Sequence, residues 1–252
     1  DLGVSGKKAL VLASSKGWEE PAPSRLDVGS EGHHHCTHQG NLEATANDIR
    51  KLTGAIVTTV IADITTEEGR KETLAVCPSP DILVNNAGGP PPGGFRNWDR
   101  EDWISAIDDN KLRAIFMIKA TVDGMIGRKF GRIVNITASA VRAPIELLGL
   151  SNGARCGLTG FCAGLARKTV ADNVTINAIH PDRLKATLEG SAIASGTSLE
   201  DATAERMAEN PSGRFGDPSE FGEFCAFICS DQAGYITGQN LLINVDGYPS
   251  TF

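Results

Sequence analysis

Two short stretches of this chain carry residues suited to binding a flat, polar ligand. Asn86-Ala87-Gly88-Gly89 ends an apolar run, and glycine lacks a Cβ, so this stretch presents bare backbone to whatever binds there. Asp63 ends another apolar run, where its carboxylate can accept a hydrogen bond from the amino group of an adenine. We therefore expect a nucleotide across both stretches. The alternative is a turn that needs glycine only for its backbone conformation.

A histidine-rich run has the residue types of a metal site. Imidazole and thiolate suit Zn²⁺, and His33-His34-His35-Cys36 is followed closely by His38. Adjacent side chains along a chain point in different directions, however, and no second cluster of such ligands follows downstream. The sequence therefore predicts no metal site.

Short β-rich runs alternate with helical patterns along the chain. Strands are predicted at 7–13, 55–63, 81–89, 131–138, 173–181 and 240–247, and helices at 41–52, 66–76, 98–125, 151–171 and 218–230. Consecutive apolar positions are typical of parallel strands buried on both faces. We expect one α/β domain over residues 1–252, a doubly wound parallel sheet of about seven strands. The segment 184–214 follows a strand end and is expected to be a substrate lid rather than an ordinary surface excursion.

The composition excludes several classes of protein. The chain has 252 residues, a net charge of −7 and a pI near 5.3, which argues against a nucleic-acid surface. Its longest apolar runs, such as Ile115–Ile118 and Phe224–Cys229, are far shorter than a membrane span, and its first residues show no signal-peptide pattern. Six cysteines without a CxxC pair are expected to be buried, in a reducing compartment. We expect a cytoplasmic protein that binds neither nucleic acid nor membrane.

These motifs resemble the short-chain dehydrogenase/reductase family over nearly the whole chain. The resemblance also rests on Asn110, on Arg214-Phe215-Gly216-Asp217-Pro218 and on Ile236-Thr237-Gly238-Gln239, in the family's order. It implies a Rossmann fold and an oxidoreductase, similar to 3-oxoacyl-carrier-protein reductases, that moves a hydride between NAD(P) and a small carbonyl or alcohol substrate. Lys16 favours NADP over NAD. The cofactor-binding residues implied are Ser14, Ser15, Lys16, Gly17, Asp63, Ile64, Asn86, Ala87, Gly88, Gly89 and Pro181.

The family's chemistry uses a serine, a tyrosine, a lysine one helical turn later, and an asparagine from an earlier helix. The matching positions are Ala138 or its neighbour Ser139, then Ser151, Arg155 and Asn110. The two tyrosines, Tyr235 and Tyr248, lie near the C-terminus, so no shift of register supplies a phenol.

The resemblance therefore implies a catalytic group of Asn110, Ser139, Ser151 and Arg155 with an altered chemistry. Ser151 can donate a hydrogen bond to a substrate oxygen, but a serine hydroxyl is a far weaker acid than a phenol. Arg155 can bind the cofactor ribose and stabilise a developing alkoxide, although it cannot release its proton. The alternatives are that Ser151 only caps a helix and that Arg155 is an ordinary surface residue.

The phosphate-binding loop is where the chain departs most from the family. Of the family's glycines, the stretch 12–19 keeps only Gly17, and Glu19 places a carboxylate where the pyrophosphate should lie. Residues 18–41 have the right length for a helix and a strand, but contain two prolines and few apolar residues. Reading the codons from Trp18 onward one base earlier restores a glycine at position 19. We infer a frameshifted segment, the alternative being a divergent loop that abolishes dinucleotide binding.

Two other functions remain open on the sequence alone. The missing tyrosine fits a non-catalytic dinucleotide-binding or assembly protein on the same scaffold. Arg155 fits a haloalcohol dehalogenase-like lyase, a relative that binds no dinucleotide. The predicted helices 98–125 and 151–171 carry many small and apolar residues, and family members pair through these helices. We therefore expect a homo-oligomer, most simply a tetramer.

Overall fold

The apolar runs form one parallel sheet in a computed structural model that describes residues 2–12, 31–36, 39–181, 198–208 and 210–244. Within this described part the seven strands follow the order β3-β2-β1-β4-β5-β6-β7, and every neighbouring pair is parallel. This order confirms the predicted doubly wound sheet. The strands are β1 Lys8–Leu12, β2 Glu31–Cys36, β3 Val57–Ile61, β4 Ile82–Asn85, β5 Gly131–Ile136, β6 Val174–Pro181 and β7 Asn240–Ile243.

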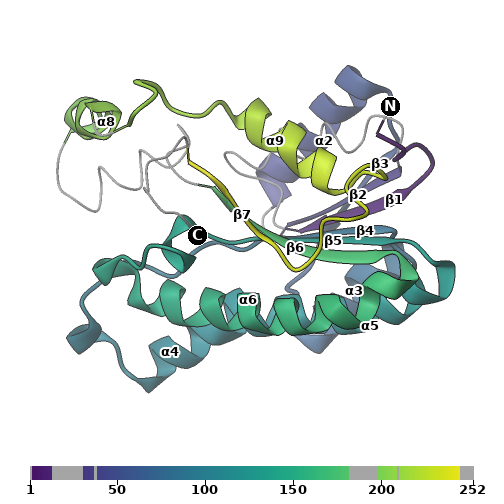
Figure 1. Ribbon diagram of the computed structural model, residues 1–252, viewed down its shortest axis with the longest axis horizontal. Coiled ribbons are helices and arrows are strands. Elements are labelled where there is room, and N and C mark those ends of the chain that lie inside the picture. The colour runs from purple at the N-terminus through teal and green to yellow at the C-terminus, as the bar shows by residue number, and fades with distance from the viewer. Residues whose placement is uncertain (1, 13–30, 37–38, 182–197, 209, 245–252) are drawn as a thin grey trace.

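Helices cover both faces of the sheet (Figure 1). The helices α3, α5 and α6 lie on one face, and α2 and α9 lie on the other. The α-helices are α2 Gln39–Thr53, α3 Glu67–Val76, α4 Arg100–Ile107, α5 Arg113–Arg128, α6 Gly149–Thr169, α8 Leu199–Ala208 and α9 Pro218–Ile228. Short turns of 3₁₀-helix are η2 Phe95–Asn97, η4 Ser139–Val141, η5 Glu146–Leu148 and η6 Val170–Asp172.

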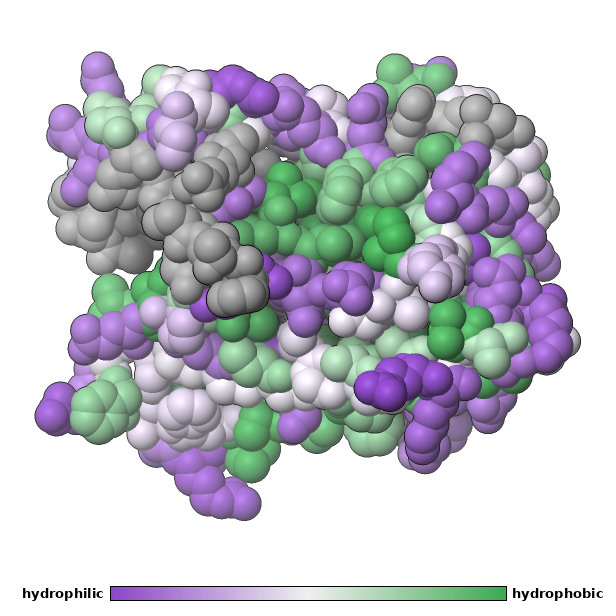
Figure 2. Space-filling view, viewed as in Figure 1, coloured by the Kyte–Doolittle hydropathy of each residue, from purple (hydrophilic) through white to green (hydrophobic). Residues whose placement is uncertain are grey.

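The two faces of the central strands β1, β4, β5 and β6 contribute to two separate hydrophobic cores. In β1, Leu10 and Leu12 join the core under α5 and α6, whereas Ala9 and Val11 join the core under α9. Successive strand residues point to opposite faces, so burial on both sides requires an apolar residue at nearly every position. At the β7 edge Leu241 and Ile243 remain half-buried, and Figure 2 shows apolar side chains gathered beneath α9 on this face of the molecule.

Local capping explains where several helices begin. Asp217 and Glu220 form a capping box at the start of α9, with Pro218 at the first helical position. Arg214 clamps the Glu220 carboxylate with two bonds of 2.7 and 2.8 Å, which lowers the pKa of Glu220 to about 2. The motif around Asp217 is therefore a helix start.

The predicted continuous helix over 98–125 is wrong in one respect. α4 and α5 are separated by a π-helical segment, η3 Asp108–Leu112. The wider turn rotates Asn110 into the interior, where only 3% of its surface is exposed. Such π-bulges cost stability and occur frequently at functional sites.

Three other expectations need correction or completion. Residues 31–36 of the anomalous segment form a strand in register between β1 and β3, although residues 13–30 lie outside the described part. The predicted loop 184–214 contains a helix, α8. Cys156 is exposed on α6, so the expected burial of the cysteines is wrong there. It holds for Cys77, Cys162, Cys225 and Cys229.

Candidate active site

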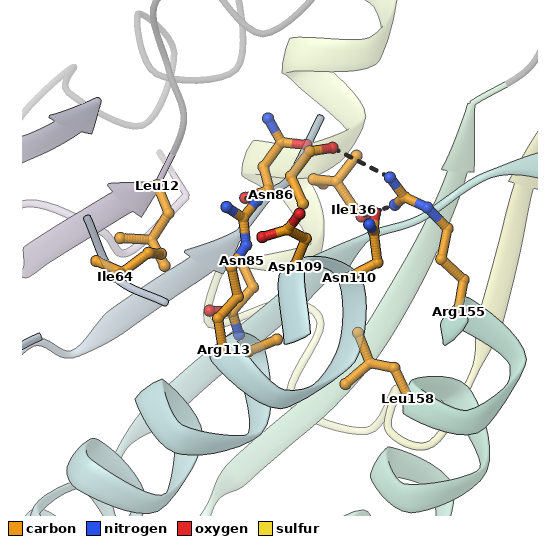
Figure 3. A pocket seen from close by; sticks show the side chains of 12 residues that line it. Leu12, Ile64, Asn85, Asn86, Asp109, Asn110, Arg113, Ile136, Arg155 and Leu158 are labelled. Carbon is orange, nitrogen blue, oxygen red and sulfur yellow. Dashed lines mark hydrogen bonds between the residues drawn. The ribbon is translucent and has the colours of Figure 1, made fainter. Parts of the chain in front are cut away.

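The carboxyl ends of β1 and β4 meet where the strand order reverses. β1 pairs with β2 on one side and β4 on the other, so the chain leaves these two strands in opposite directions and opens a crevice. A small cavity of about 10 Å³, room for about one water molecule, lies there. Strand ends and the helices η3, α5 and α6 supply its lining (Figure 3): Leu12, Ile64, Asn85, Asn86, Ala87, Asp109, Asn110, Arg113, Ala114, Ile136, Arg155 and Leu158.

Two arginines hold the turn that follows β4. Arg113 Nη2 donates a 2.8 Å hydrogen bond to the carbonyl oxygen of Asn86, and Arg155 Nη2 donates one of 3.0 Å to that of Ala87. Below them, Asn85 Nδ2 donates to Asn135 Oδ1 on β5 at 3.0 Å. Hydrogen bonds from charged donors are the stronger kind. The path of the backbone through this turn is therefore fixed before any ligand binds.

Gly88 and Gly89 leave open space beside this fixed turn. Neither has a positive φ, and a Cβ built on either would meet no atom of the described residues within 4 Å. Within the described part of the chain, the turn therefore needs glycine neither for its own conformation nor for its packing, which disfavours the alternative of a turn that needs glycine only for its backbone. The missing side chains leave room for something outside the chain.

The turn after β3 forms the facing wall. Asp63 is exposed, and its Oδ1 accepts from the backbone N and Oγ1 of Thr65 at 2.9 and 2.7 Å. Helix α3 approaches this turn so closely that a Cβ on Gly69 would lie 2.0 Å from the Asp63 carbonyl oxygen. Arg70 donates to the carbonyl oxygens of Ile64 and Thr65 at 3.0 and 2.7 Å. Asp63 and Ile64 thus lie on a rigid turn.

Asn110 brings an unsatisfied polar group into the cavity. Neither its amide nitrogen nor its amide oxygen has a hydrogen-bond partner in the described part of the chain, although both are buried. Buried polar atoms are almost always hydrogen-bonded, so the orphaned amide calls for a water molecule or a ligand. The π-helical segment is what turns it toward Arg155 (Figure 3).

Arg155 is buried, with 6% of its surface exposed, so the surface alternative is wrong. Its Nη1 donates to the carbonyl oxygen of Ile136 and its Nη2 to that of Ala87, both at 3.0 Å. The guanidinium thereby joins the end of β5 to the turn after β4.

The two predicted serines lie outside the cavity lining. Ser151 is buried inside the first turn of α6, whose N-cap is Leu148, so the alternative that Ser151 caps the helix is also wrong. Ser139 is half-buried at the start of η4. The structure therefore brings Asn110 and Arg155 together with Ile64, Asn86 and Ala87 in one lining, to which neither serine belongs.

Comparison with known proteins shows which family the chain belongs to. A family model described as enoyl-(acyl carrier protein) reductase matches residues 33–247. The chain belongs to the short-chain dehydrogenase/reductase family. The match leaves out the anomalous residues 18–32, where the sequence departs most from the family's pattern.

Relatives and solved structures agree with this membership. The chain is 28% identical over 247 residues to a 3-oxoacyl-[acyl-carrier-protein] reductase of Vibrio harveyi, covering 96% of this chain and 98% of that one. It is 35% identical over 166 residues to an acetoacetyl-CoA reductase of Cupriavidus necator, covering 65% and 64%. The fold matches L-sorbose reductase from Gluconobacter frateurii with a TM-score of 0.91, at 24% identity and 99% coverage of both chains. The chain is thus an NAD(P)-dependent oxidoreductase of this family, and neither the lyase nor the assembly-protein alternative is favoured.

Some predicted residues of the family site cannot be placed. Ser14, Ser15, Lys16 and Gly17 lie outside the described residues, whereas Pro181 ends β6 and is half-buried. In the described part of the chain no three metal-ligating side chains gather into a candidate metal site, and the side chains of the 33–38 run fall outside that part. Among the described helices, none is both long and apolar enough to cross a membrane.

Sequence analysis missed a histidine at this edge of the sheet. His180 is completely buried at the end of β6, and its Nδ1 shares a hydrogen bond with Thr137 Oγ1. Burial and, to a lesser extent, the charges of Arg142 and Arg155 together lower the pKa of His180 to about 4, although a hydrogen bond with Asn240 partly opposes them. The imidazole is therefore neutral at pH 7. An imidazole at the carboxyl end of a buried strand was the signal that could have found it.

The other missed residues are arginines. Arg113 and Arg70 lie on helices that the sequence predicted, but nothing in their spacing shows that they reach the carbonyls of two neighbouring loops. Only the packing of α3 and α5 against the strand ends brings them there.

Proposed function

We propose that this chain is an NADP(H)-dependent reductase that interconverts a small-molecule carbonyl and its alcohol. The observation that carries the proposal is the open Gly88–Gly89 backbone at the reversal of strand order, next to carbonyls held by Arg113 and Arg155. No described residue requires glycine there, and a bound ligand would supply the reason. The orphaned amide of Asn110 supports the same conclusion.

The preference for NADP(H) rests on Lys16 and on relatives. An ammonium beside the phosphate loop can meet a 2′-phosphate as a point charge. The L-sorbose reductase was solved with NADPH, and a 3-oxoacyl (acyl-carrier-protein) reductase of Agrobacterium tumefaciens C58 with NADP bound. The relatives' substrates range from acyl thioesters to a sugar, so the proposal names a carbonyl or alcohol and no single compound.

When bound, the nicotinamide would supply or take up the hydride, and the chain's own residues would bind and orient the cofactor and the substrate. Asp63 and Ile64 on one wall, and Asn86 and Ala87 on the other, would hold the cofactor. Arg155 keeps its charge at any working pH and would stabilise negative charge on the substrate oxygen. Ser151 and Ser139 would contribute hydroxyl donors. Without a phenol as general acid the turnover should be slow.

The test measures cofactor binding and turnover on the same protein, after its mass and its peptides across 14–42 have been verified. We expect NADPH to bind, and 3-oxoacyl thioesters or simple ketones to be reduced slowly. Ser151→Tyr should raise turnover, by as much as about 10²-fold, because a positioned general acid contributes roughly 10²–10⁴-fold. Cys156→Tyr is the matched control, since it places the same phenol on an exposed face of α6. Absence of NADPH binding to the wild type would refute the proposal.

We further propose a homotetramer in the cytoplasm, with 184–214 as the substrate lid. Apolar side chains on α4, α5 and α6 remain exposed, including Trp103 at 36%, Phe116 at 39% and Phe161 at 38%. The half-buried β7 edge is a second apolar face (Figure 2). Such faces on one chain are typical of surfaces that pair with a copy. A monomer in sedimentation at micromolar concentration would contradict the oligomer, and the location rests on the net charge of −7 and the free cysteines.

A further inference from the structure

Two walls of the crevice are tied to each other by side chains outside the predicted site. One wall is the turn after β3, which carries Ile64, and the other is the turn after β4, which carries Asn86. Both residues line the cavity (Figure 3). Each turn is held by an arginine from a helix, Arg70 of α3 on the first and Arg113 of α5 on the second.

Arg70 spans the distance between α3 and α5. Its Nη1 donates to the carbonyl oxygens of Ile64 and Thr65 at 3.0 and 2.7 Å. Its guanidinium carbon lies 4.8 Å from the centre of the Phe116 ring, a cation–π contact across the gap between the helices. Planar guanidinium groups combine such stacking with hydrogen bonds in a fixed geometry, which a lysine cannot reproduce.

Phe116 and Arg113 belong to neighbouring turns of α5. They are three residues apart, so they lie on the same side of the helix. Arg113 donates to the carbonyl of Asn86 on one wall, while Phe116 holds Arg70 and through it the other wall. The start of α5 therefore acts as a spacer between the two turns. We call Arg70, Arg113 and Phe116 the clip.

The contacts of the clip differ from those of a core residue. Arg70 and Arg113 are half-buried, Phe116 is 39% exposed, and the carbonyls they hold lie at the carboxyl edge of the sheet rather than within it. At such edges the backbone positions bound ligands. Ile64, by contrast, is only 1% exposed, so a small shift of its turn would change the shape of the crevice directly.

We propose that Arg70 and Arg113 are positioning residues that set the separation of the two walls for the adenine half of the dinucleotide. The proposal rests on the function proposed above, because the walls matter only if a dinucleotide binds between them. The clip keeps a constant distance between the turn after β3, which carries Asp63, and the turn after β4, which carries Asn86. Arg70 does not line the cavity and takes no part in the transfer at the nicotinamide end.

The test separates the two halves of the cofactor. Arg70→Met and Arg113→Met keep the aliphatic stem but remove the donors. We expect each variant to bind NADPH and adenosine 2′,5′-bisphosphate about tenfold more weakly, as for the loss of one hydrogen bond from a charged group. In Arg70→Met, whose arginine does not line the cavity, binding of reduced nicotinamide mononucleotide, which lacks the adenine half, should stay within about twofold, and kcat at saturating NADPH should be unchanged.

Arg128→Met is the matched control. Arg128 is also an arginine of α5 that donates to a loop carbonyl, that of Pro80 at 2.7 Å, but at the opposite edge of the sheet. Arg128→Met should change the affinity for neither half of the cofactor. If the wild type binds NADPH and both clip variants bind it equally well, the inference is overturned. Equal loss of both half-cofactors, or a loss matched by Arg128→Met, would also overturn it, since the effect would then be on general stability. Failure of the wild type to bind NADPH would instead refute the proposed function.

Discussion

Arg155 offers the sharpest test of how the site is built, because its hydrogen bonds to backbone join the end of β5 to the turn after β4. Arg155→Met keeps a stem of similar length and removes the guanidinium. The carbonyl oxygens of Ile136 and Ala87 then each lose the hydrogen bond of 3.0 Å that Arg155 donates. These carbonyls end β5 and begin the open turn, so the change acts on stability and on the site together.

The magnitude follows from the two bonds and the burial. A buried acceptor left without its donor costs about 1–3 kcal/mol. The variant also removes the cost of burying a cation, which offsets part of this loss. We expect the free energy of unfolding to fall by about 2–4 kcal/mol. For a chain of this size, that corresponds to a fall in Tm of roughly 5–10 °C.

Thermal and urea unfolding measure the stability, and a titration with NADPH measures the site. Arg142→Met is the control, because Arg142 is a neighbouring but exposed arginine, and such changes usually stay within about 0.5 kcal/mol. NADPH binding should weaken in Arg155→Met and persist in Arg142→Met. If Arg155→Met has the same Tm as the wild type and binds NADPH as tightly, Arg155 neither stabilises these two segments nor lies at the cofactor site.

Two further perturbations test other parts of the structure. The pKa of His180 is about 4 in the fold against 6.5 for an ordinary histidine, so neutral His180 stabilises the fold above pH 6.5, and this stability is lost as the pH falls toward 4. The free energy of unfolding should therefore fall between pH 7 and pH 5 in the wild type by about 2 kcal/mol more than it falls in His180→Gln. If urea unfolding shows the same pH dependence for both proteins, His180 is not a buried neutral imidazole. Gly88→Ala should leave Tm nearly unchanged but weaken NADPH binding about tenfold or more, because its Cβ meets none of the residues that the structure describes and would project into the space for the cofactor. Gly127→Ala, which also meets no neighbour, is the control, and equal affinity in both variants would show that no ligand lies against Gly88.

The architecture was predictable because it depends on local patterns. Strands such as Lys8–Leu12 and Gly131–Ile136 are buried on both faces, so their consecutive apolar residues identify them without knowledge of their partners. Strand–helix alternation then leaves few topologies besides a doubly wound parallel sheet. The predicted helix over 98–125 failed only at its π-helical segment, because Asp108–Leu112 contains no proline or glycine that would mark a change in the helix.

The candidate site was likewise predictable only in part. Glycine at 88 and 89, asparagine at 86 and 110 and aspartate at 63 are set by the sequence, since residue type alone decides where backbone is bare and where an amide or carboxylate is available. Which of these groups meet was decided by the tertiary structure. The sequence offers Arg155 as a ligand for a ribose, and packing of α6 against β5 is what brings its guanidinium to the carbonyls of Ile136 and Ala87.

The same holds for the groups that spacing could not reveal. His180 becomes a neutral imidazole, and Arg70 and Arg113 become braces, only because distant segments bury the first and bring loop carbonyls to the others. Hydrogen bonds and desolvation act over a few ångströms, between residues that lie far apart along the chain. The sequence by itself therefore determined the elements and the reactive groups, whereas packing decided the partners and the protonation state of each group.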